Sequence, residues 1–246
     1  MFLNNNLLSG NIPPTLGQCI DLYKLDLSHN RLIGSIPPEI SGMREIRIFL
    51  NLSHNHLDGP LPIELSKLEN VQEIDVSSNN LTGSIFFQIS SCIALRMVNF
   101  SNNSLQGNLP DSLGDLKNLE SFDVSGNHLS GMIPVSLNKI HTLTYLNLSF
   151  NNFEGLIPSG GIFNLVTNRS FLGNQHLCGA VSGMPACSQK SRWFRSLGGG
   201  NAVVVENMGN STANLCGSIG YIAPGTNSSI ASSVKVNTKS KSSSMF

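Results

Sequence analysis

The sequence predicts an α/β repeat fold, a right-handed solenoid of about seven coils with 24 residues in each. Two observations support this prediction. An Asn recurs every 24 residues, with a single interval of 25 residues before Asn55, and a Gly follows each Asn four positions later. Two apolar residues with one polar residue between them precede the Asn. The recurring residues are Asn6, Asn30, Asn55, Asn79, Asn103, Asn127 and Asn151.

Each coil is expected to begin with a short β-strand. The apolar pair before the Asn, for example Leu50 and Leu52, alternates with polar residues as in a half-buried strand. The apolar side chains then point into the solenoid, and the residues between them face outward on a concave sheet.

The recurring Asn is expected to form a ladder inside the solenoid. An amide side chain both donates and accepts hydrogen bonds, so it can satisfy backbone groups where the chain leaves the strand. Each such Asn lies among apolar neighbours, and its replacement would leave buried backbone groups without partners.

The second half of each coil is expected to be an extended segment followed by a short helix or 3₁₀ turn. The recurring Gly indicates a backbone conformation, or a close approach, that a Cβ atom would obstruct. An Ile-Pro or Leu-Pro pair follows, as at Ile36-Pro37, and Phe86 takes the place of the Pro in one coil. The Pro stiffens an extended segment and cannot donate to a sheet.

Composition excludes some classes of partner. The chain has 246 residues with 15 Lys and Arg against 15 Asp and Glu, so bulk attraction to nucleic acid or to an anionic membrane is not indicated. The part before residue 190 is mildly acidic, and the part after it is mildly basic. We expect no membrane span and no signal peptide in this chain, because it has neither a long apolar stretch nor a basic start followed by an apolar run.

The run Leu-x-x-Leu-x-Leu-Ser-x-Asn-x-Leu-x-Gly-x-Ile-Pro resembles the plant-specific class of leucine-rich repeats. Over residues 1 to about 187 the chain is similar to the ectodomains of plant receptor-like serine/threonine kinases. The resemblance implies an inner surface that binds a peptide or protein ligand or a co-receptor ectodomain. It also implies a parent protein at the plasma membrane whose ectodomain is extracellular; the location of this chain stays open.

The resemblance divides the chain into three parts. Residues 1–163 are the repeats, which start without the paired-cysteine cap of the family. Residues 164–187, with the run "SFLGNQHLCGAVSGMPAC", resemble the C-terminal cap. Cys178 and Cys187 match the two cysteines of that cap, which implies a disulfide in an oxidising compartment, and two free thiols in a reducing one.

Residues 188–246 are expected to be a disordered tail rich in Ser, Asn and Gly. Within it, residues 210–225 resemble the end of a kinase activation segment, with Gly225 where the family has Glu. The Gly-rich phosphate loop, the catalytic Lys, the His-Arg-Asp loop and the Asp-Phe-Gly motif are not found in the sequence. We therefore expect no catalysis by this chain.

The candidate ligand-binding residues are outward positions of the concave strands and their neighbours. They are Asp26, Glu73, Asp75, Arg96, Asn99, Glu120, Asp123, Tyr145 and Asn147. A column of Asp26, Asp75 and Asp123 would favour a ligand with a cationic group. The alternative is that these side chains are only solvated polar residues.

Other site types are expected to be few. Glycosylation sequons suited to a secreted product start at Asn51, Asn80, Asn99, Asn102, Asn147 and Asn168. The six His residues are scattered along the chain, so no metal site and no cofactor are expected. The sequence thus favours a binding module, with two alternatives: the receptor kinase activity of a longer parent, or a truncated product without function.

Overall fold

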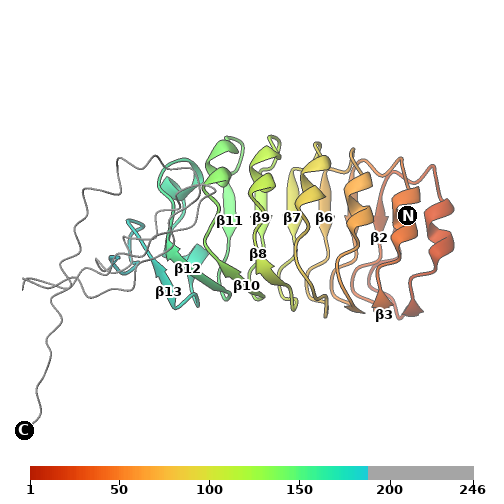
Figure 1. The fold of residues 1–246 in the computed structure, drawn as a ribbon. Coiled ribbons are helices and arrows are strands. Elements are labelled where there is room, and N and C mark those ends of the chain that lie inside the picture. Colours follow the sequence, from red (N-terminus) through yellow and green to blue (C-terminus); the bar gives the residue numbers. More distant parts are fainter. Residues whose placement is uncertain (188–246) are drawn as a thin grey trace, which may run out of the picture. The chain divides into compact units, whose positions relative to one another are not determined.

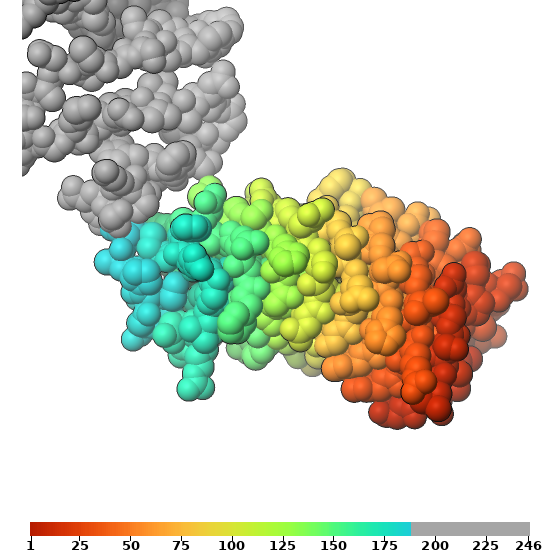
Figure 2. Space-filling view, turned by 90° about the horizontal axis from the view of Figure 1, so that it is seen from below, coloured from red at the N-terminus to blue at the C-terminus, as the bar shows by residue number. Residues whose placement is uncertain are grey.

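The computed structural model describes residues 1–187, which form a solenoid of stacked coils (Figure 1). The predicted disordered tail at 188–246, and the activation-segment resemblance at 210–225 within it, lie outside the described residues. Figure 2 shows successive coils as adjacent colour bands, from red at the first coil to cyan at the last described one.

The predicted strands form a six-stranded parallel sheet, here called the inner sheet. Each strand pairs with the strand one repeat away, as where Leu50 lies opposite Ile74. The central residue of a strand is buried and its neighbours are more exposed, which is the expected alternation. The strands are β2 (Leu25–Asp26), β4 (Phe49–Asn51), β6 (Glu73–Asp75), β7 (Met97–Asn99), β9 (Ser121–Asp123) and β11 (Tyr145–Asn147).

Two further parallel sheets, here called the lateral sheets, were not predicted from the sequence. They form where the chain turns away from the inner sheet, around the recurring Leu-x-Gly, and lie along the lower edge in Figure 1. One contains β1 (Ser9–Asn11), β3 (Arg31–Ser35) and β5 (His56–Asp58). The other contains β8 (Gln106–Asn108), β10 (His128–Gly131), β12 (Asn152–Leu156) and β13 (His176–Cys178).

Between the two lateral sheets a single bridge joins Pro60 to Thr82. Pro60 has no N–H group to donate to a ladder, which accounts for the break at this coil. The seven recurring Gly residues have φ angles between 72° at Gly34 and 84° at Gly155, a region that favours Gly. This is the backbone constraint expected from their recurrence.

The helical segment of every coil is a 3₁₀-helix in the described part of the chain. Pro precedes most of these segments in an extended conformation, and Phe86 adopts the same conformation with φ −75° and ψ 145°. Phe86 can therefore replace Pro without changing the coil. The segments of the first six coils are η1 (Pro14–Gln18), η2 (Pro38–Gly42), η3 (Ile63–Lys67), η4 (Phe87–Ser91), η5 (Asp111–Asp115) and η6 (Val135–Lys139).

The interior is one continuous apolar core that runs through all the coils. Most of its members are Leu, Ile and Val from the strands and 3₁₀-helices, and the largest fully buried side chains include Phe100, Phe122 and Phe153. Burial of each large apolar side chain stabilises the fold by roughly 1.5–3 kcal/mol.

The recurring Asn side chains lie between coils and are buried from Asn30 onward. Asn103 is representative. Its Oδ1 accepts a hydrogen bond from the Leu81 N–H at 3.0 Å, and its Nδ2 donates to the Val76 and Phe100 carbonyls at 3.0 and 3.2 Å. Since Leu81 and Val76 belong to the preceding coil, Asn103 joins two coils, and the same holds for the other buried Asn residues of the ladder.

The ladder has one more member than the repeat pattern predicts. Asn174 donates to the Leu148 and Phe171 carbonyls and accepts from the Phe153 N–H at 2.9 Å, as the other Asn residues do. The interval from Asn151 to Asn174 is 23 residues, and the flanking residues depart from the repeat pattern. At the other end, Asn6 bonds only to the Leu3 and Asn4 carbonyls of its own turn.

Residues 161–187 cover the end of the apolar core. The last 3₁₀-helices, η7 (Gly161–Asn164) and η8 (Asn168–Phe171), bury Ile162, Phe163 and Phe171 against it. Strand β13 extends the lateral sheet by pairing with β12. A disulfide joins Cys178 to Cys187, with 4.9 Å between their Cα atoms.

Two cysteines in the described residues are free thiols. Cys92 is fully buried. This burial is the main cause that raises the pKa of its thiol to about 12, and the negative charge of Glu69 is a smaller cause. Cys19 is half-buried in the first coil. Cys92 therefore behaves as a small apolar side chain in the core.

Replacement of a ladder Asn in the middle of the solenoid is expected to cost far more than replacement at its first coil. Asn103→Ala leaves the buried Leu81 N–H without a partner and should lower the free energy of unfolding by about 2–4 kcal/mol. Asn6→Ala removes only exposed bonds within one turn and should cost less than about 0.5 kcal/mol. Urea unfolding followed by circular dichroism measures both, and equal losses would contradict the role of the ladder.

Loss of the disulfide is expected to loosen the cap. The bridge closes a loop with a sequence separation of 9 residues, so the double variant Cys178→Ser, Cys187→Ser should lose roughly 2–3 kcal/mol. Hydrogen exchange in residues 168–187 should accelerate in that variant and in the reduced native protein. The variant itself should not respond to reductant; if it did, another pair of cysteines would be responsible.

Candidate functional site

The solvent side of the inner sheet, here called the inner face, contains most of the predicted ligand-binding residues. One column of this face alternates between Asp and Asn from coil to coil. It consists of the last strand residues Asp26, Asn51, Asp75, Asn99, Asp123 and Asn147.

Every member of this Asp/Asn column binds the turn that follows its own strand. Its Oδ1 accepts a hydrogen bond from the backbone N–H of the Ser two residues later, and in five of the six coils also from the Ser hydroxyl. For Asp123 these bonds to Ser125 are 2.9 and 2.7 Å long. One oxygen of each side chain is therefore used by the fold.

The second carboxylate oxygen of two Asp residues is also bonded. Asn99 Nδ2 donates to Asp75 Oδ2 at 3.2 Å, and Asn147 Nδ2 donates to Asp123 Oδ2 at 3.0 Å. The hydroxyl of Tyr145 donates to the same Asp123 oxygen at 3.1 Å. The Asp/Asn column thus links neighbouring coils, which gives these residues a structural role beside any role in binding.

Tyr145 lies at the edge of this column with half of its side chain exposed. Partial burial and then the charge of Asp123 raise the pKa of its hydroxyl above the ordinary value. The hydroxyl therefore stays protonated at neutral pH and serves as a donor.

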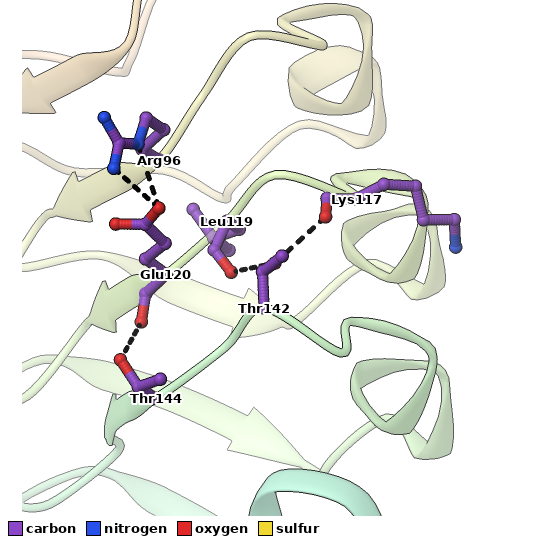
Figure 3. A network of polar contacts seen from close by, with 6 residues as sticks. All are labelled: Arg96, Lys117, Leu119, Glu120, Thr142 and Thr144. Atoms are coloured by element: carbon purple, nitrogen blue, oxygen red, sulfur yellow. Dashed lines mark hydrogen bonds and ion pairs between the residues drawn. The ribbon is translucent and has the colours of Figure 1, made fainter.

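An ion pair lies beside the strands, between two neighbouring coils (Figure 3). Arg96 donates from Nε and Nη2 to Glu120 Oε1, at 3.0 and 2.7 Å, and Thr144 Oγ1 donates to the Glu120 carbonyl at 3.2 Å. Both charged side chains are about half exposed, so the pair contributes only about 0–1 kcal/mol to stability. Its charges can therefore be exchanged for those of a ligand at small cost.

Large apolar side chains gather at the first coils of the inner face and were not among the predicted site residues. Tyr23 is 53% exposed, and Ile48 44%. Phe2 packs against Phe49 with 5.9 Å between ring centroids, and Lys24 Nζ lies 4.9 Å from the Phe2 ring centroid. Phe49 points outward because it alternates with the buried Leu50, whereas Tyr23 and Ile48 lie two residues before the buried Leu25 and Leu50, where strict alternation would point inward. We call Phe2, Tyr23, Ile48 and Phe49 the N-terminal apolar patch.

The glycosylation candidates differ in their surroundings. Asn99 and Asn147 belong to the Asp/Asn column, and their Nδ2 atoms are bonded to carboxylates. Asn51 belongs to the same column. Asn80 and Asn102 are exposed, and Asn168 is half-buried at the start of η8. Glycosylation of any of these residues remains a prediction.

Away from the inner face, an open groove of about 1020 Å³ lies between η5 and η6. Acidic and basic side chains both line it, including Asp111, Asp115 and Lys139. This mixture of charges favours no single class of ligand.

Two further properties concern residues 1–187. They contain no group of three or more His, Cys, Asp or Glu side chains placed to hold a metal ion. No helix in this part of the chain has the length and apolar character needed to cross a membrane.

The repeats match a known family. Six segments, which together cover more than half of the chain, match the Leucine Rich Repeat family model: residues 21–43, 48–68, 70–92, 94–116, 118–140 and 142–162. A curated relative, described as a leucine-rich repeat receptor-like serine/threonine-protein kinase of Arabidopsis thaliana, is 50% identical over 82 residues. The match covers 33% of this chain and 8% of that protein.

Solved structures of plant receptor ectodomains have the same fold. The Arabidopsis receptor kinase HAESA, solved with the peptide hormone IDA and the co-receptor SERK1, is 33% identical with a TM-score of 0.68 over 75% of this chain and 30% of that one. The ectodomain of GASSHO1/SCHENGEN3 from Arabidopsis thaliana is 32% identical with a TM-score of 0.63 over 76% of this chain and 25% of that one.

This chain spans less than a third of the length of each of these three relatives. The matched repeats, the stacked parallel strands and the likeness to these ectodomains agree with one another. The chain belongs to the leucine-rich repeat family, and its solenoid has the fold of plant receptor kinase ectodomains.

Proposed function

We propose that residues 1–187 are a recognition module that binds an extended peptide or a protein segment along the inner face. The main support for this proposal is that the side chains that hold the coils together differ from those that face solvent on the inner face. The apolar core and the Asn ladder hold the coils together, while the N-terminal apolar patch and the Arg96–Glu120 pair face solvent. Side chains that the fold does not need are available for a ligand.

The dimensions of the inner face suit a short peptide. Neighbouring strands are about 4.8 Å apart, so the five steps from β2 to β11 make roughly 24 Å, which an extended chain of about seven residues spans. The complex of the HAESA ectodomain with a peptide hormone and a co-receptor supports this class of ligand and partner.

The proposed contacts fall in two groups. Apolar side chains of the ligand pack on Tyr23 and Ile48 at one end of the inner face. Polar or charged groups meet Arg96, Glu120 and Tyr145 toward the other end. Glu73 lies between the two groups, and the Asp/Asn column runs beside both of them along the whole inner face. The three Asp residues of that column favour a cationic group in the ligand.

The proposed setting is the extracellular side of a plant membrane, as part of or derived from a receptor kinase. The Cys178–Cys187 disulfide supports an oxidising compartment. Phosphoryl transfer, if it occurs, belongs to the longer parent protein, because residues 1–187 are the repeats and their cap.

Peptide selection tests the binding face without a known ligand. Peptides selected from a random phage library on the full chain should bind Ile48→Ala at least about tenfold more weakly than the native protein, because Ile48 is open on the inner face. The matched control is Ile93→Ala, which removes an equally apolar side chain, 64% exposed, beside η4. Calorimetry measures both affinities. Equal binding to the two variants, or no enrichment at all, would contradict the proposal.

Nucleotide binding tests the alternative. A protein that binds MgATP is stabilised by it, so its melting temperature rises with nucleotide concentration. The full chain is expected to show no rise in a thermal shift assay that includes a complete protein kinase as the positive control. A reproducible rise would favour a kinase function for this chain.

A further inference from the structure

The residue that precedes each ladder Asn has a positive φ angle. The turn into the ladder imposes this conformation, and the residue types found there are mostly ones that accept it, such as Asn, His and Gly. The non-Gly residues at this position are Asn5, His29, His54, Ser78, Asn102 and Phe150, with φ between 53° and 55°.

Two of these residues, His29 and His54, are exposed and belong to adjacent coils. They are 25 residues apart in the sequence, yet one repeat of separation places them side by side. Their rings are stacked with 4.1 Å between centroids and 10° between planes. Among the described residues they are the one stacked pair of His rings.

The backbone beneath the two rings is fixed. The His29 N–H donates to the Ser53 carbonyl at 3.0 Å, and the His54 N–H donates to the Ser77 carbonyl at 2.9 Å. The His54 carbonyl in turn accepts from the Asn30 N–H. The separation of the two side chains is therefore set by the pitch of the solenoid before any ligand arrives.

We propose that His29 and His54 together bind a divalent transition-metal ion such as Zn²⁺. Imidazole nitrogens bind such ions at about 2.0–2.1 Å and favour them over Ca²⁺ and Mg²⁺. In the stacked arrangement the nitrogen lone pairs lie in parallel planes and do not converge. Since both side chains are exposed, each ring turns about its χ2 bond to direct a nitrogen toward a shared ion.

The pair supplies two ligands, and no third His, Cys, Asp or Glu of residues 1–187 joins them in a metal-binding group. A tetrahedral ion would thus keep two positions for water or for a carboxylate or imidazole of a bound protein.

Calorimetric titration of the full chain with Zn²⁺ near neutral pH tests the site. His29→Asn and His54→Asn should each weaken binding at least about tenfold. Asn suits this test because Asn5 and Asn102 occupy the same turn position with φ 54° and 53°, so the backbone is not strained. The control is His128→Asn, which removes an exposed imidazole whose strand partner on the preceding coil is Gln106, and it should bind Zn²⁺ as the native chain does.

A second variant moves the His pair to another two coils and tests whether the turn position alone is enough for Zn²⁺ binding; we call it the relocation variant. In the His29→Asn, His54→Asn background, adding Ser78→His and Asn102→His places two imidazoles at the same turn position of the next two coils, and Zn²⁺ binding should return. Binding that survives in the double Asn variant, or that falls equally with His128→Asn, would overturn the proposal. So would a relocation variant that stays folded by circular dichroism and does not bind.

Discussion

The coils of this solenoid are held in register by hydrogen bonds between the ladder Asn side chains and the backbone of neighbouring coils. A chain that turns once in every coil must leave backbone groups inside the solenoid, away from water and away from strand partners. From Asn30 onward, each ladder Asn satisfies these groups in its own coil and in the preceding one, as Asn103 does for Ser101 and Leu81. The ladder thereby fixes the pitch at which the apolar side chains stack.

Because the ladder holds the coils together from inside, some outward side chains can support the fold while others are free to contact a ligand. Because buried Leu and Asn residues maintain each coil, most outward side chains are free to vary. The Asp/Asn column is intermediate. Asp75 and Asp123 face solvent, yet both of their carboxylate oxygens accept hydrogen bonds from the chain itself. The side chains of Tyr23 and Ile48 form no such hydrogen bonds, so substitutions there can suit a ligand without disturbing the fold.

The same regularity converts sequence distance into spatial contact. Two residues one repeat apart occupy equivalent positions on adjacent coils, so their side chains become neighbours whatever lies between them in the chain. Arg96 meets Glu120 in this way on the inner face, and His29 meets His54 at the turn before the ladder. A site on this fold therefore consists of residues from adjacent coils, about one repeat apart in the sequence, and not of a continuous sequence motif.

The repeat, the inner strands, the inward Leu residues and the seven recurring Gly could be predicted from the sequence, because each follows from a pattern within one coil. The sequence also placed Asp26, Arg96 and Tyr145 near the inner face. Four features could not be predicted from the sequence and are seen only in the folded chain: the lateral sheets, the extra ladder residue Asn174, the bonds that use both oxygens of Asp123, and the stacked His pair. These features depend on contacts between coils. The register of one coil against the next is fixed only when the apolar core packs and the ladder Asn residues form their hydrogen bonds.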